Sequence, residues 1–152
     1  MTIIKLLLIA ALLSVAIVFF TLYKNDANLS QAPGFTERLQ VFLSSNLAKT
    51  ADDHKFAELQ TPQFNMSAEK LYQRVLKAGA DLGWKVLSHD SDNQSANFIA
   101  LSPVFLFEDD VNVQVQFVDQ QHSLLHVHSG SRVGRVDFAA NSGHIQALIN
   151  KL

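Results

Sequence analysis

The chain has 152 residues, contains no cysteine and carries a formal net charge of −2, with 12 lysines and arginines against 14 aspartates and glutamates. This length allows one domain plus an accessory segment. The lack of cysteine excludes both a disulfide framework and a lipid-modified N-terminal cysteine. Because the basic residues are scattered, there is no basic face for nucleic acid, and we exclude nucleic acid as a partner.

The accessory segment comes first, because Leu6 to Leu22 form 17 residues without a charge. As a helix they span about 26 Å, enough to cross a thin bilayer. A cleaved signal peptide is the alternative, but a cleavage site needs small residues where this chain has Phe19, Phe20, Leu22 and Tyr23. The sequence therefore predicts an uncleaved single-pass anchor within residues 1–24. The slight excess of positive charge on its short side predicts an anchor in the inner (cytoplasmic) membrane, with the rest of the chain outside the cytoplasm.

Residues 25–34 are rich in turn formers and are predicted to be a tether to a domain over 35–152. Apolar residues at helical spacing predict a short amphipathic helix over 35–48. Residues 49–64 are expected to be loop or irregular structure. A second helix is expected from the N-cap Ser67 to Gly83.

Antiparallel strands follow. They are expected at Trp84–Ser88, at Asn97–Phe107, at Val111–Phe117 with its strict alternation, and around Leu125 and Val127, before a last helix over 141–151. The expected fold class is α+β, with a transmembrane helix followed by a two-layer domain of about four antiparallel strands packed against two or three helices.

Several phenylalanines occur in or beside the expected strands: Phe98, Phe105, Phe107 and Phe117. We interpret them as core residues, since apolar runs are typical of strands covered on both faces. The alternative is that they line a pocket, which would make the protein a carrier of an apolar ligand.

The densest polar region is the stretch 127–141, predicted to connect the last strand to the last helix. Pairing of the last two strands brings Asp109 and Asp110 level with Arg132. In the structural interpretation, Arg132 forks onto one of these two aspartates. In the functional interpretation, Arg132, Arg135 and the backbone N–H groups of the loop bind an anion or a lipid head group. The candidate ligand-binding residues are Asp109, Asp110, Ser131, Arg132, Arg135 and Asp137.

Two arrangements would support chemistry in the same region. His126 and His128 share one face of a strand, which suits zinc or copper, but no third ligand is evident, and we predict no metal or other cofactor. Ser129 or Ser131 with a histidine and Asp137 would form a hydrolytic triad, but the Gly-x-Ser-x-Gly elbow is missing, and no catalytic residue is predicted. A small hydrolase or metal-dependent enzyme using the His122 to Asp137 region is therefore the alternative to a binding or scaffolding domain.

Three motifs resemble the bacterial family known as domain of unknown function 1499: Gly83-Trp84-Lys85-Val86, Asp109-Asp110-Val111 and Ser129-Gly130-Ser131-Arg132-Val133-Gly134-Arg135-Val136-Asp137. The resemblance covers about residues 62–152 and implies association with the cell envelope, often through an N-terminal signal or anchor, without an established activity. His128 and His144 stand where the family has arginines, which implies a weaker anion site. The partner is expected to be the membrane through residues 6–22, and beyond it an envelope protein, a lipid or an anionic ligand.

Overall fold

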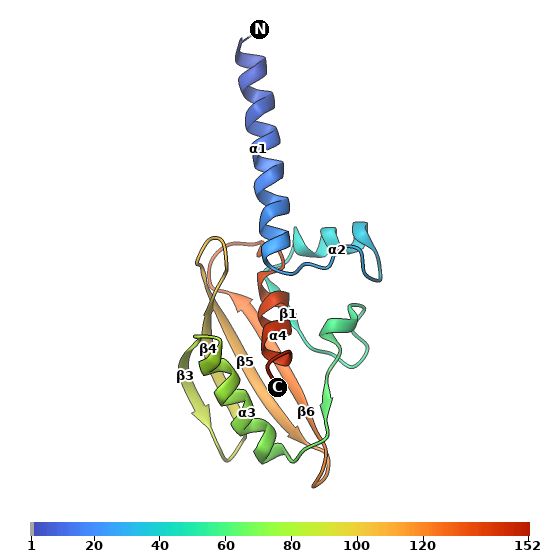
Figure 1. Ribbon diagram of the computed structural model, residues 1–152, viewed down its shortest axis with the longest axis vertical. Helices are drawn as coiled ribbons and strands as arrows, with labels where there is room; N and C mark the ends of the chain where they lie inside the picture. Colours follow the sequence, from blue (N-terminus) through green and yellow to red (C-terminus); the bar gives the residue numbers. More distant parts are fainter. Residues whose placement is uncertain (1) are drawn as a thin grey trace.

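The computed structural model describes residues 2–152. A long helix, α1 (Thr2–Lys24), stands on one end of an α+β domain (Figure 1). The helix is exposed along most of its length and becomes buried only at Thr21 and Leu22. It is long and apolar enough to cross a membrane, a property that it shares with signal sequences.

The domain is built on one antiparallel sheet of six strands, in the order β1-β6-β5-β4-β3, with β2 also pairing with β6. The four predicted strands are β3 (Lys85–Asp90), β4 (Ser95–Leu101), β5 (Glu108–Phe117) and β6 (Ser123–Ser131). Two more lie in the region expected to be irregular or helical, β1 (Leu47–Lys49) and β2 (Gln63–Phe64), so that there are six strands rather than four. They have three and two residues, too few for an alternating pattern to indicate them.

The helices of the domain are α2 (Phe35–Phe42), the 3-10 turn η1 (Ala57–Leu59), α3 (Ala68–Asp81) and α4 (Ala140–Ile149). The predicted N-cap of α3 is confirmed, because Ser67 Oγ accepts a hydrogen bond from the Lys70 N–H at 3.4 Å. The helix expected over 35–48 ends at Phe42, since residues 47–49 pair with β6 instead.

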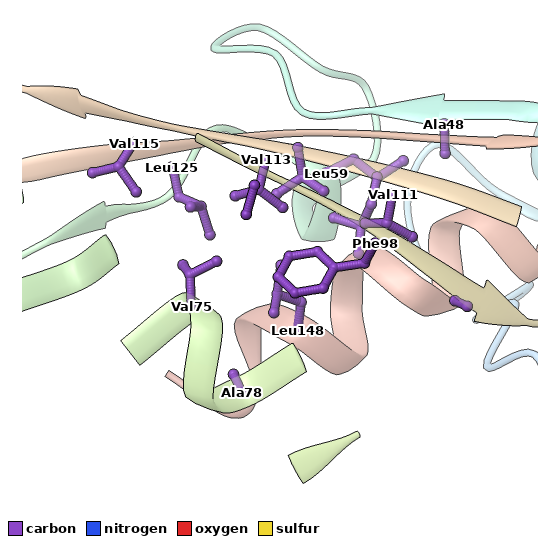
Figure 2. Packing of buried hydrophobic residues seen from close by; sticks show 14 of the residues in the cluster. Ala48, Leu59, Val75, Ala78, Phe98, Val111, Val113, Val115, Leu125 and Leu148 are labelled. Atoms are coloured by element: carbon purple, nitrogen blue, oxygen red, sulfur yellow. The ribbon is translucent and has the colours of Figure 1, made fainter. Parts of the chain in front are cut away.

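The core lies between one face of the sheet and the helices α3 and α4, which cover that face (Figure 1). In Figure 2, Phe98, Val111 and Leu125 point from the strands toward Val75 of α3 and Leu148 of α4. These five side chains are fully buried. The domain therefore has two layers, as predicted, and the other face of the sheet is more open.

Three of the four phenylalanines assigned to the core are not in it. Phe98 is fully buried, but Phe105, Phe107 and Phe117 are 43%, 48% and 63% exposed. The strand expected to reach Phe107 ends at Leu101, because Ser102 closes a tight loop through its main chain and hydroxyl, both bonded to Phe107. Pro103 has no N–H to offer to a strand ladder. The interpretation of Phe105, Phe107 and Phe117 as core residues was therefore wrong.

Of residues 25–34, expected to be a tether, the first half is packed against the domain and residues 30–33 are exposed. Asn25 and Ala27 are each 3% exposed, and Asn25 Nδ2 donates to the Phe138 carbonyl at 2.8 Å. On the other side, a Cβ added at Gly143 of α4 would come within 2.8 Å of the Asn25 carbonyl oxygen. The end of α1 is thus joined to the domain by close contacts.

Arg38 fixes the same segment from inside the domain. Its guanidinium donates to the main-chain carbonyls of residues 27, 31 and 32, at distances of 3.0 to 3.4 Å. It also forks onto Glu58 at 2.6 and 2.9 Å and lies 4.3 Å from the centre of the Phe56 ring. A composition rich in turn formers does not distinguish a free linker from a segment whose carbonyls are satisfied in this way.

Candidate functional site

The polar stretch predicted from the sequence lies at the end of the domain that carries α1. β6 ends at Ser131, residues 132–139 form a loop, and α4 follows (Figure 1). Together with the loop 102–107 and the end of α1, this loop encloses a cavity of about 20 Å³. A space of this size holds about one water-sized group. We call this cavity and its lining residues the α1-proximal site.

The floor of the α1-proximal site carries two buried acceptors. Asp109 is fully buried, and its Oδ2 accepts a hydrogen bond from Nε2 of His144 at 2.9 Å. Its Oδ1 has no hydrogen-bond partner among residues 2–152, and the same holds for Oδ1 of Asn25, whose amide nitrogen is committed to Phe138. Because leaving a buried acceptor unsatisfied is costly, the site favours a hydrogen-bond donor or a cation.

Asp137 closes one side of the same site and holds the start of α4. Its Oδ1 accepts from the Ala139 N–H at 3.0 Å, and its Oδ2 accepts from the main-chain and side-chain nitrogens of Asn141 at 3.1 and 2.6 Å. Burial raises the pKa of Asp137, and the charge of Asp109 adds to this, although the hydrogen bonds from Asn141 and Ala139 oppose it. A second carboxylate, partly buried and close to Asp109, makes the site acidic.

A network of hydroxyl and amide groups connects Asp137 to β6. Asn141 accepts from Ser129 Oγ at 2.6 Å and donates to Ser131 Oγ at 2.9 Å. Ser129 and Asn141 are fully buried, and Ser131 lines the cavity. The network is largely satisfied internally, which fixes the loop 132–139 against the sheet.

Arg132 is paired, but on the surface. It forks onto Asp110, with contacts between 2.6 and 3.0 Å, and reaches Glu108 at 2.6 Å. Its side chain is 36% exposed and that of Asp110 is 40% exposed. Arg135 is exposed, and no hydrogen bond or ion pair joins its side chain to any residue in the described range 2–152. The structure thus brings Asp109, Ser131 and Asp137 together at the cavity, joins Arg132 to Asp110 beside it, and leaves Arg135 on the loop.

Replacing Arg132 with alanine is expected to change the free energy of unfolding only slightly, because exposed ion pairs are screened by water and contribute little. Urea unfolding of the wild type and the variant, followed by the fluorescence of Trp84, measures the difference. A loss as large as that caused by truncating a core residue such as Phe98 would contradict this expectation.

The histidines proposed for chemistry do not meet the serines and Asp137. Nε2 of His126 contacts Gln116 Oε1 at 2.8 Å, and His122 contacts Asp119 at 2.8 Å. His128 is exposed on the more open face of the sheet. Within residues 2–152 no three histidine, aspartate or glutamate side chains are grouped as metal ligands. The hydroxyl of Ser129 donates to Asn141 rather than to a histidine.

The sequence candidates did not include Asn25, which lines the cavity, or His144, which bonds to Asp109. Asn25 belonged to the presumed tether, and no local pattern connects it with Phe138, 113 positions away. His144 carried a signal, because it lies on the predicted last helix at a position where the family has an arginine.

One known family matches most of the chain. The model of a family described as protein of unknown function (DUF1499) matches residues 28–152, a longer stretch than the resemblance noted over 62–152. No curated protein matches the chain. The match covers all strands of the sheet, the helices that pack on it and nearly all of the α1-proximal site, and on this basis the chain belongs to the DUF1499 family.

Proposed function

We propose that this protein is a single-pass protein of the cell envelope, held in the cytoplasmic membrane by α1, whose α+β domain lies outside the cytoplasm and binds a ligand without performing chemistry. The observation that carries the proposal is the change in burial along α1. Side chains such as Leu12 are 70% exposed, whereas Leu22 is 1% exposed. An apolar helix that the rest of the described chain leaves uncovered is stabilised by lipid.

The orientation rests on charge. Lys5 lies on the short side of the apolar segment, and on the domain side Lys24 is offset by Asp26. A slight bias of positive charge toward the short end favours its retention in the cytoplasm. The family resemblance, which implies association with the cell envelope, supports the same orientation.

A binding role is supported by the α1-proximal site, which offers unsatisfied acceptors rather than a proton relay. The serines donate to or accept from Asn141, and His144 is committed to Asp109. A carrier of a whole apolar molecule is less well supported, because the cavity has about 20 Å³ whereas pockets for small molecules have about 300 to 1,000 Å³. The cavity suits one small polar group of a larger ligand.

To test the proposal, the full chain is produced with a C-terminal tag, and the membranes of the producing cell are isolated and analysed. We expect it to resist extraction at alkaline pH, to keep the mass of the uncleaved chain, and to be digested only when protease reaches the outer side of the cytoplasmic membrane. A control with Leu12→Arg and Leu13→Arg should release the protein, since each charge costs about 3 kcal/mol at the centre of a bilayer. A soluble product shortened near residue 23 would overturn the anchor, and a domain digested only from the cytoplasmic side would overturn the orientation.

A further inference from the structure

The α1-proximal site is surrounded by apolar side chains that face solvent. Phe105, Leu106, Phe107 and Val133 are between 43% and 65% exposed. The rings of Phe105 and Phe107 stack with their centres 5.6 Å apart. They belong to two loops, after β4 and after β6, that lie level with the end of α1 (Figure 1).

These side chains lie where the bilayer would be. Residues Thr21 and Asn25 at the end of α1 line the same cavity as Phe105, Phe107 and Val133. If α1 spans the membrane, as the proposed function states, the helix leaves the lipid at this level, and the apolar loops meet the boundary between head groups and acyl chains. Aromatic and aliphatic residues are stabilised at that boundary.

The polar floor of the cavity defines what kind of group can enter. Oδ1 of Asp109 and Oδ1 of Asn25 are buried and accept no hydrogen bond within the described chain. Asp109 and Asp137 give the floor negative charge, and His144 bonds to Asp109. A primary ammonium group has three N–H donors and one positive charge. It therefore has enough donors for both acceptors and also brings a positive charge to the carboxylates. A water molecule has two O–H donors but no charge, so it would leave the negative charge of the floor in place.

The size of the cavity and the residues around it limit the choice of head group further. A cavity of about 20 Å³ admits a group the size of water and hence of an ammonium, but not a trimethylammonium group, which also has no N–H donor. Arg135 lies on the cavity loop between Val133 and Val136, exposed and without an ion-pair partner in residues 2–152. A guanidinium in this position suits a phosphate.

We propose that the α1-proximal site binds the head group of a phospholipid with a primary amine, taken from the leaflet around α1. The ammonium enters the cavity between Asp109 and Asn25, and the phosphate faces Arg135. The acyl chains lie along α1 and the exposed loops 105–107 and 133. The ligand of the proposed binding domain is then a membrane lipid, and the site selects among lipids by their head groups.

The first experiment compares short-chain lipids on the purified full chain in detergent. Dihexanoyl phosphatidylethanolamine is expected to bind about tenfold more tightly than the choline or the glycerol lipid. The choline head group has no N–H donor for the buried acceptors, and the glycerol head group has O–H donors but no positive charge for the carboxylates. Native mass spectrometry measures the fraction of one-to-one complex, and the shift in unfolding temperature gives a second readout. Equal binding of all three lipids by the wild type would overturn the proposal. Tighter binding of the glycerol lipid would also overturn it and would make the site one for anions.

Matched variants then locate the site. Asp109→Asn removes one charge from the floor of the cavity and should abolish the preference for the ethanolamine lipid. Asp110→Asn, one position along the strand and on its outer face, should keep the preference. Arg135→Ala should weaken the binding of all three lipids to the same extent. If Asp110→Asn lost the preference as fully as Asp109→Asn, the cavity would not be the site.

The lipid site and the membrane anchor are tested by independent experiments. The lipid comparison is made in detergent and does not require α1 to span a bilayer, whereas the extraction and protease experiments test the anchor alone. If Asp109→Asn does not fold, the wild-type preference and the Arg135→Ala variant still decide the proposal.

Discussion

Replacing Arg38 with alanine is expected to lower the free energy of unfolding by about 3 to 5 kcal/mol, the cost of removing one partner of a buried ion pair. Arg38 is fully buried, and the side chain of Glu58 is only 14% exposed. The variant would leave the carboxylate of Glu58 uncompensated and three carbonyls between residues 27 and 32 without their donor. Since these carbonyls belong to the segment that follows α1, the loss should also loosen the junction between α1 and the domain.

The pH dependence gives this prediction a second readout. Burial raises the pKa of Glu58, but the hydrogen bonds from Arg38 and from the main-chain N–H of Glu58, together with the charges of Arg38 and His54, outweigh it, so that this pKa lies below its ordinary value. A carboxyl with a lowered pKa stabilises the fold above its unfolded pKa and loses that contribution as the pH falls through its folded pKa. The difference in stability between wild type and Arg38→Ala should therefore be large at neutral pH and shrink below about pH 4.

Urea unfolding of the full chain in detergent, followed by the fluorescence of Trp84, measures the effect. Arg38→Lys keeps the charge but cannot fork, and its stability should lie between wild type and Arg38→Ala. The control is Lys55→Ala, which breaks an ion pair with Glu37 whose side chains are 75% and 43% exposed. If Arg38→Ala cost no more than Lys55→Ala, the buried pair would not hold this segment.

The parts of the fold that were predictable are those with long local patterns. The alternation of valines from Val111 to Val115 defines β5, and the register with β6 places Asp110 opposite Gly130, close to Arg132 as expected. Ser67 defines the start of α3. By contrast, β1 and β2 exist only through their pairing with β6, a long-range contact that leaves no periodic signal in so few residues.

Part of the candidate site was also predictable from a local sequence pattern. Side chains alternate across a strand, so Asp109 faces the buried side with Val111, and Asp110 faces outward. The sequence therefore contained the answer to which aspartate pairs with Arg132, although both were kept as partners. The role of Asn25 was not predictable from the sequence, because it depends on a loop more than 100 residues away. The loop 102–107 could not be recognised inside its apolar run, since exposed phenylalanines and phenylalanines in a core have the same sequence pattern.

The second large effect is expected at His144. Replacing it with alanine should lower the free energy of unfolding by about 3 to 5 kcal/mol, because Asp109 is fully buried and His144 is its hydrogen-bond partner. The variant also removes the edge contact of the imidazole with Trp84, whose ring centre lies 5.8 Å away. Urea unfolding at neutral pH measures the loss. His126→Ala is the control, since that side chain bonds to Gln116 on the more open face of the sheet and should change stability little.

A double-mutant cycle separates the two causes of this loss. If the uncompensated charge of Asp109 dominates, the double variant Asp109→Ala with His144→Ala should be more stable than His144→Ala alone, because the second change removes the stranded carboxylate. If lost packing against Trp84 dominates, the two losses should add. The additive result would mean that the stability of the fold does not depend on the pairing of Asp109 with His144.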